Sequence, residues 1–131
     1  MLLLIDAGNT RIKWALAAPT GAAGAWLASG AVAHAQLDTL QAAWGGLAIS
    51  GVLLSNVAGA AIGARLRAQL PANLPPQSIA TFASLPHLAG VSNAYREPSQ
   101  LGCDRFAAAI GAHALAPGQA VIVANCGTAT T

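Results

Sequence analysis

The sequence MLLLIDAGNTRIKWALA, residues 1–17, carries the pattern that decides the fold. Residues 2–6 form a short apolar run that ends in an acid, which predicts a buried strand. Gly8 and Asn9 tolerate positive φ and predict a turn. Residues 11–17 then alternate basic and apolar side chains, as is typical of a half-buried strand. We therefore expect the chain to begin with a β-hairpin.

The rest of the chain alternates apolar runs with amphipathic segments. Strands are expected over residues 25–33, 49–57, 78–82 and 120–125, and helices over residues 37–44, 60–70 and 100–115. A hairpin followed by strand–helix alternation predicts a mixed α/β fold. The last expected strand leads into a Gly/Thr turn, as at the start of a second structural unit. We therefore expect the chain to be the amino-terminal part of a longer protein.

Composition excludes several classes of protein. Of the 131 residues, 55% are hydrophobic and 8% are charged, so a disordered chain is excluded. The net charge of +2 is too small for a nucleic-acid-binding surface. Polar residues interrupt the apolar stretch 47–64, and the start lacks a basic region, so no membrane span or signal peptide is expected. The two cysteines suit a reduced, cytoplasmic compartment.

The few charges are concentrated in two short segments. Residues 6–13 and 96–105 together hold seven of the ten charged side chains. Two solvated loops would explain this distribution, and so would two walls of one polar site. Both segments also contain Gly with Asn, Thr, Ser or Gln, which are residue types that bind phosphates and hydroxyls. The three histidines share no metal-ligand spacing, and we expect each of them to be structural.

The first candidate motif is DAGNTR, residues 6–11. A Gly-Asn-Thr turn after a buried strand can direct backbone N–H groups and a hydroxyl at phosphate oxygens. Asp6 can hold Mg²⁺, because hard cations prefer oxygen ligands. An ordinary hairpin turn explains the same residues equally well.

The second candidate motif is CGTATT, residues 126–131, which again places Gly and hydroxyl residues after an apolar run. Two such turns can hold the phosphates of one nucleotide from both sides. Taken alone, this segment is better explained as a polar tail.

The third candidate motif is YREPSQLGCDR, residues 95–105. Asp104 is expected in the first turn of a helix, where a carboxylate is stabilised in its charged form. It can then accept a proton from a substrate hydroxyl, as in phosphoryl transfer. Arg105 can hold a carboxylate or a phosphate. Helix capping with a salt bridge is the alternative explanation.

Taken together, the order and spacing of the three motifs resemble the type III pantothenate kinases and the related Bvg accessory factor group. The resemblance implies a ribonuclease-H-like domain of the acetate kinase/sugar kinase/heat-shock chaperone/actin superfamily over residues 1–116. It also implies that residues 117–131 hold the first strand and phosphate loop of a second such domain. The implied activity is ATP-dependent phosphorylation of pantothenate, the first step of coenzyme A synthesis.

The resemblance also assigns residues to roles. Asp104 is the implied general base. The implied ATP- and phosphate-binding residues are Asp6, Ala7, Gly8, Asn9, Thr10, Arg11, Ile12, Lys13 and Thr128. The implied pantothenate-binding residues are Tyr95, Gly102, Cys103, Asp104 and Arg105.

The implied cofactors are Mg²⁺ and a monovalent cation, K⁺ or NH₄⁺, and the full-length protein is expected to be a homodimer. The family usually has an acidic residue at the monovalent-cation position, where this chain has Asn125, and this difference puts the cation dependence in doubt. Two other functions remain open. One is a non-catalytic nucleotide-binding regulatory protein, and the other is an inactive fragment of the kinase.

Overall fold

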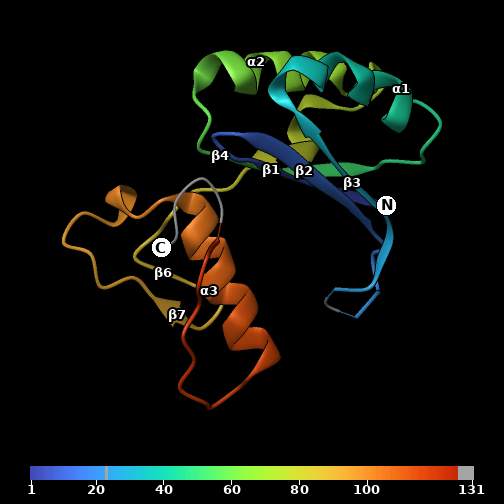
Figure 1. Ribbon diagram of the computed structural model, residues 1–131. Coiled ribbons are helices and arrows are strands. Elements are labelled where there is room, and N and C mark those ends of the chain that lie inside the picture. Colours follow the sequence, from blue (N-terminus) through green and yellow to red (C-terminus); the bar gives the residue numbers. More distant parts are fainter. Residues whose placement is uncertain (23, 127–131) are drawn as a thin grey trace. The chain divides into compact units, whose positions relative to one another are not determined.

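The computed structural model describes residues 1–22 and 24–126 (Figure 1). The chain divides into two compact units, Met1–Phe82 and Ala83–Thr131. The helices and strands of the first unit are β1 (Leu2–Ala7), β2 (Arg11–Ala17), β3 (Trp26–Ala33), the 3₁₀ helix η1 (His34–Thr39), α1 (Leu40–Trp44), β4 (Gly51–Asn56), α2 (Ala60–Gln69), the 3₁₀ helix η2 (Pro76–Ser78) and β5 (Ile79–Thr81). Those of the second unit are β6 (His87–Leu88), β7 (Val91–Ser92), the 3₁₀ helix η3 (Pro98–Gln100) and α3 (Cys103–Leu115).

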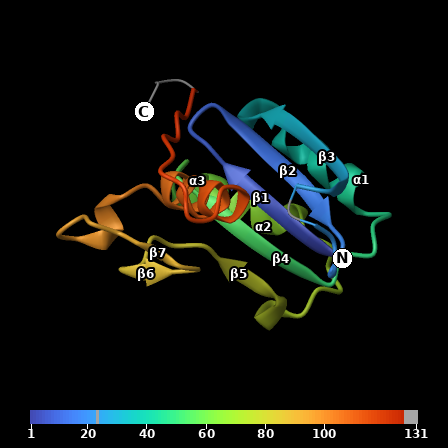
Figure 2. The same cartoon turned by 90° about the horizontal axis from the view of Figure 1, so that it is seen from below.

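The first unit is built on a mixed five-stranded sheet with the strand order β3-β2-β1-β4-β5 (Figure 2). β1 pairs antiparallel with β2 on one side and parallel with β4 on the other. β5 continues the sheet parallel to β4, and α2 connects these two strands. Because β1 and β4 run in the same direction, their carboxyl ends meet at one edge of the sheet.

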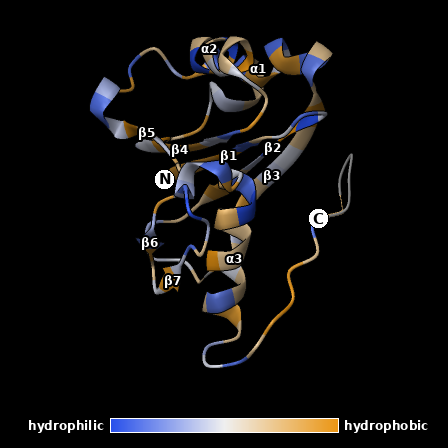
Figure 3. Cartoon of the chain, turned by 90° about the vertical axis from the view of Figure 1, so that its left-hand side faces the viewer, coloured by the Kyte–Doolittle hydropathy of each residue, from blue (hydrophilic) through white to orange (hydrophobic). Residues whose placement is uncertain are grey.

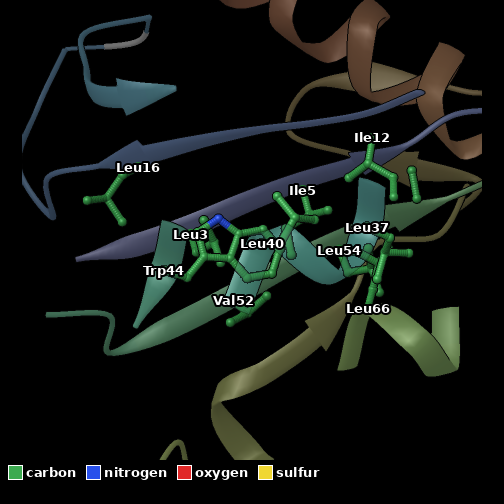
Figure 4. Close-up of a cluster of buried hydrophobic side chains, with 11 residues drawn as sticks. Leu3, Ile5, Ile12, Leu16, Leu37, Leu40, Trp44, Val52, Leu54 and Leu66 are labelled. Atoms are coloured by element: carbon green, nitrogen blue, oxygen red, sulfur yellow. The ribbon is translucent and has the colours of Figure 1, made fainter. Parts of the chain in front are cut away.

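The core of the first unit lies between the sheet and α1 and α2, which cover one of its faces (Figure 1). Every second residue of β1 is buried, as expected when one face of a strand packs against helices. The fully or almost fully buried side chains are Leu3, Ile5, Ala7, Ile12, Leu16, Leu37, Leu40, Trp44, Val52, Leu54 and Leu66, most of which are labelled in Figure 4.

Two tryptophans pack against each other in this core. The rings of Trp14 and Trp44 meet edge to face, with centroids 6.2 Å apart and planes at 87°. Trp14 on β2 is paired with Gly30 on β3. A β-carbon at position 30 would lie 2.8 Å from Trp14 Nε1, so the indole fits only because residue 30 lacks a side chain.

The start of α2 depends on one asparagine. Asn56 Oδ1 accepts a hydrogen bond from the Ala58 N–H, and Asn56 Nδ2 donates to the Gly59 carbonyl. Gly59 has a φ of 93°, a positive value that residues with a side chain rarely adopt. Farther along α2, Arg65 pairs with Asp38 of η1, with 3.2 Å between Arg65 Nη2 and Asp38 Oδ1.

The second unit contains a short hairpin and the longest helix of the described chain. β6 and β7 are joined by Ala89 and Gly90, both with positive φ, as a two-residue hairpin turn requires. A β-carbon at Gly90 would lie 2.9 Å from His113 Nε2 of α3, so the close approach of the helix also requires glycine.

Most of the expected elements form, with two differences. The helix expected over residues 37–44 is a 3₁₀ turn followed by the short α1. No strand is assigned within residues 120–125, and the side chains of Val121, Ile122 and Val123 are exposed. A strand needs a hydrogen-bonded neighbour, and apolar β-branched residues alone do not supply one. Figure 3 shows apolar colouring along this segment. Among the described residues, no helix is both long and apolar enough to cross a membrane.

We predict that Gly30→Ala lowers the free energy of unfolding of the protein by about 1–3 kcal/mol, the usual cost of overpacking a core. The added methyl group would push the Trp14 indole toward Trp44. Urea unfolding followed by circular dichroism measures the change. Gly46→Ala is the matched control, because a β-carbon at position 46 meets nothing within 4 Å. Equal stability of the two variants would show that Trp14 is not confined as described.

Candidate active site

Asp6 lies near the carboxyl end of β1, on the sheet face opposite to the buried residues of the strand. It is paired with Lys13 of β2 and with Ser55 of β4. Residues paired in this way across neighbouring strands project from the same face of the sheet. A carboxylate, an ammonium group and a hydroxyl group therefore lie side by side at one edge of the sheet.

The acid and the lysine form a loose ion pair. Lys13 Nζ lies 3.9 Å from Asp6 Oδ2, and the lysine side chain is 68% exposed. Exposed pairs of this kind add little stability. The ammonium group is accordingly able to turn toward an incoming anion at small cost to the fold.

The loop that follows Asp6 is held by hydrogen bonds from three directions. The Gly8 N–H donates to the Arg11 carbonyl at 3.1 Å, and the Val57 N–H donates to the Ala7 carbonyl at 3.0 Å. The ring of His34 contacts the Gly8 carbonyl at 2.8 Å. These bonds fix the turn that we expected to bind phosphate.

The other residues expected in this phosphate loop form two groups, one with buried and one with exposed side chains. The side chains of Ala7 and Ile12 are buried in the core, so only their backbone can face a ligand. Asn9, Thr10 and Arg11 are exposed at the turn. The polar members of the motif are thus accessible, and the apolar members anchor the loop to the sheet.

In the second unit, Asp104 lies in the first turn of α3, as the sequence predicted. Its Oδ1 atom would be 2.6 Å from a β-carbon at position 102, so the carboxylate lies against the backbone of Gly102. A side chain at position 102 would displace the acid. The sequence Gly-Cys-Asp-Arg thus places the Asp104 carboxylate close to the Gly102 backbone at the start of α3.

Asp104 and Arg105 do not form an ion pair with each other or with any other residue of the described ranges. The alternative explanation for these two residues was helix capping with a salt bridge. That salt bridge does not form among the described residues. The side chain of Asp104 is half-buried, and that of Arg105 is exposed. Both groups are available to a ligand. The side chain of Cys103 is half-buried.

Tyr95 is 48% exposed and lies on a loop that Asn93 organises. Asn93 Oδ1 accepts from the Tyr95 N–H at 3.1 Å, and Asn93 Nδ2 donates to the Pro98 carbonyl at 3.0 Å. The Ser84 hydroxyl donates to the Leu101 carbonyl at 2.7 Å just before α3. Side-chain to backbone bonds thus hold the whole segment between Tyr95 and Asp104.

Sequence reasoning missed several residues of this arrangement. Ser55 had a detectable signal, because it is a polar residue near the end of the mostly apolar strand expected over residues 49–57. His34 and Asn93 had none, because each acts on backbone groups that only the folded chain brings within reach. Our expectation that His34 is structural stands, with a specific role at the Gly8 loop.

Two expected site residues belong to the last part of the chain. Thr128 lies outside the described residues. Asn125 is half-buried in the segment without an assigned strand. No group of three or more His, Cys, Asp or Glu side chains suited to a metal ion occurs within residues 1–22 and 24–126.

Comparison with known proteins identifies the family. The sequence model of the family described as type III pantothenate kinase matches residues 2–131. A type III pantothenate kinase of Janthinobacterium sp. (strain Marseille) is 54% identical, with 100% of this chain and 52% of that protein covered. The type III pantothenate kinases of Herminiimonas arsenicoxydans and Paraburkholderia xenovorans are 49% and 46% identical, with 100% and 98% of this chain and 52% and 46% of those proteins covered.

The chain spans about half the length of the curated relatives that it matches. The matched half contains all three motifs singled out in the sequence. On the strength of the family match and of this identity, the chain belongs to the type III pantothenate kinase family.

Proposed function

We propose that the complete protein carrying this chain transfers the γ-phosphoryl group of ATP to the hydroxyl of pantothenate, giving 4'-phosphopantothenate. This is the first step of coenzyme A biosynthesis. The family match over residues 2–131 is the observation that carries the proposal. Within the described residues, the Asp104 carboxylate lies at a helix start without an ion-pair partner, and this supports catalysis over mere nucleotide binding, because a binding protein needs no base there.

In the proposed reaction, Asp104 accepts the proton of the pantothenate hydroxyl. The freed oxygen forms a bond to the γ-phosphorus, and the bond between that phosphorus and the bridging oxygen of ADP breaks. Arg105 and Tyr95 hold the substrate, Arg105 by pairing with its carboxylate.

The first phosphate loop positions the nucleotide. The backbone N–H group of Asn9 and the Lys13 ammonium group contact phosphate oxygens and offset their negative charge. Phosphoryl transfer depends mainly on such positioning and charge stabilisation, with little covalent chemistry by the protein. Thr128 contributes from the second loop.

The residues present at the sheet edge suit Mg²⁺. The Asp6 carboxylate and the Ser55 hydroxyl are neighbouring oxygen donors, and Mg²⁺ is usually bound by one or two carboxylates together with waters and substrate phosphates. When bound, the ion neutralises charge on the nucleotide phosphates. Asn125 offers only a neutral amide oxygen to K⁺ or NH₄⁺, so we propose a weak dependence on monovalent cations.

The proposal also covers the superfamily, the cellular location and the oligomeric state of the protein. We place the protein in the acetate kinase/sugar kinase/heat-shock chaperone/actin superfamily, with ATP bound between two ribonuclease-H-like domains. We propose a cytoplasmic homodimer that binds neither nucleic acid nor membranes. The mixed sheet of the first unit, covered by helices on one face, agrees with this fold.

An inactive fragment is the second candidate for residues 1–131 taken alone. The exposed apolar side chains of Val121, Ile122 and Val123 favour it. In the proposed fold these residues belong to the first strand of the second domain, and a strand without neighbours leaves its N–H and C=O groups open to other chains.

We predict that Asp104→Asn in the complete protein lowers kcat by about 10²–10⁴-fold, because a general base contributes about this factor. The amide cannot accept the proton, and it differs little from the carboxylate in size. A coupled assay with ATP and pantothenate measures the change. Asp38→Asn is the matched control, because Asp38 is an exposed acid of the first unit. A kcat close to that of wild type for Asp104→Asn would refute the assignment of the base.

We predict that Asp6→Asn raises KM for Mg·ATP by about tenfold or more and leaves KM for pantothenate nearly unchanged. The size follows from the loss of at least one charged contact to the metal and phosphates. Raising the Mg²⁺ concentration should restore part of the loss. A rise confined to KM for pantothenate would contradict the placement of Asp6 on the nucleotide side.

We predict that residues 1–131, expressed alone, self-associate and have no measurable kinase activity. Light scattering and the same coupled assay, run beside the complete protein, test both parts. A double variant Val121→Lys, Val123→Lys should reduce the self-association, because charges oppose strand pairing. A monodisperse fragment with normal turnover would show that the truncated second domain is not required.

A further inference from the structure

One side chain from a distant part of the sequence contacts the backbone of the candidate phosphate loop. His34 opens η1, directly after β3, and its Nε2 atom lies 2.8 Å from the Gly8 carbonyl oxygen. The contact is part-buried and joins residues 26 positions apart. Ala33 pairs with Arg11, and this register brings the imidazole beside the loop.

The chemistry of the partner fixes which atom donates in this hydrogen bond. A carbonyl oxygen can only accept a hydrogen bond, so Nε2 of His34 carries a proton and donates it. A neutral ring in this state has its lone pair on Nδ1. The hydrogen bond therefore holds in the neutral and in the charged form of the histidine.

The bond also determines where the next amide points. In a trans peptide the C=O and the following N–H point in opposite directions, and none of the described peptide bonds is cis. His34 holds the Gly8 carbonyl toward itself. The Asn9 N–H, in the same peptide plane, is consequently directed away from His34.

The neighbouring groups of the loop are already engaged. The Ala7 carbonyl accepts from the Val57 N–H, and the Gly8 N–H donates to the Arg11 carbonyl. Neither of these bonds involves the C=O or the N–H of the Gly8–Asn9 peptide, so neither sets the orientation of that peptide. Glycine at position 8 leaves this peptide free to rotate in the absence of a tether.

We propose that His34 is a positioning residue of the nucleotide site. By holding the Gly8 carbonyl, it presents the Asn9 N–H to a phosphate oxygen of a nucleoside triphosphate before the nucleotide arrives. The identity of the ligand rests on the proposed function, whereas the hydrogen bond and the peptide orientation rest on the structure alone. Pre-orienting a donor in this way reduces the cost of binding.

Three variants of His34 in the complete protein separate positioning from packing. His34→Ala removes the donor and the ring. His34→Phe keeps a ring of similar size without a donor. His34→Gln keeps an N–H donor at similar reach. His87→Ala is the matched control, because His87 is an exposed histidine of the second unit that contacts the Ser92 hydroxyl.

We expect His34→Ala and His34→Phe to raise KM for ATP by about three- to tenfold, the factor that corresponds to the loss of one hydrogen bond. KM for pantothenate should stay unchanged, and His34→Gln should recover most of the affinity for ATP. A loss that is equal in all three variants, or that appears equally in both KM values, would overturn the positioning role. If His34→Ala fails to fold, the comparison of the Phe and Gln variants decides.

A second measurement is independent of catalysis. The ¹⁵N–¹H resonance of Asn9 should shift on addition of inorganic pyrophosphate to the wild-type protein, and the shift should shrink in His34→Phe but not in His87→Ala. If the wild-type protein binds pyrophosphate and ATP but does not phosphorylate pantothenate, the proposed function fails while this inference stands. If the Asn9 resonance does not respond in wild type, or responds equally in His34→Phe, the inference is wrong.

Discussion

The register of β1 between β2 and β4 is the constraint on which the site and the core both depend. It directs Leu3 and Ile5 into the core and places Asp6 beside Lys13 and Ser55 on the other face. A slip of one residue would move the acid into the core and the aliphatic side chains out of it. Burial of each large aliphatic side chain contributes about 1.5–3 kcal/mol, so the core holds the polar residues in place.

Much of the fold could be predicted from the sequence, because its pattern is local. The alternation over residues 11–17 and the acid that closes β1 are visible in adjacent positions, and both lead to the observed hairpin. Asp104 in the first helical turn follows equally from its neighbours. The predictions that failed concern features that depend on contacts with distant parts of the chain. Residues 120–125 have the composition of a strand, but pairing decides whether a strand forms, and a neighbour cannot be inferred from composition.

The candidate site shows the same difference between local patterns, which could be predicted, and contacts between distant residues, which could not. Two of its polar motifs could be recognised, because seven of the ten charged side chains fall within residues 6–13 and 96–105. The residues that hold these motifs in shape could not. Asn93 and His34 bind backbone carbonyls, and any polar side chain is capable of that. Only the three-dimensional path of the chain selects which one does so. The two units share this device, in which one side chain fixes a loop through its main chain.

The distribution of aromatic residues gives the two units different optical properties. All three tryptophans belong to the first unit. Trp44 is fully buried, the Trp14 ring packs edge to face with the Trp44 ring, and Trp26 is about half exposed. The single tyrosine, Tyr95, belongs to the second unit and lies on the loop before α3. Indole emission therefore reports on the sheet that carries the phosphate loop, with blue-shifted and red-shifted contributions from buried and exposed rings. An NMR spectrum that resolves the ring signals of Tyr95 observes instead the loop that leads to Asp104. Within this chain, each of the two units thus carries its own kind of intrinsic aromatic probe.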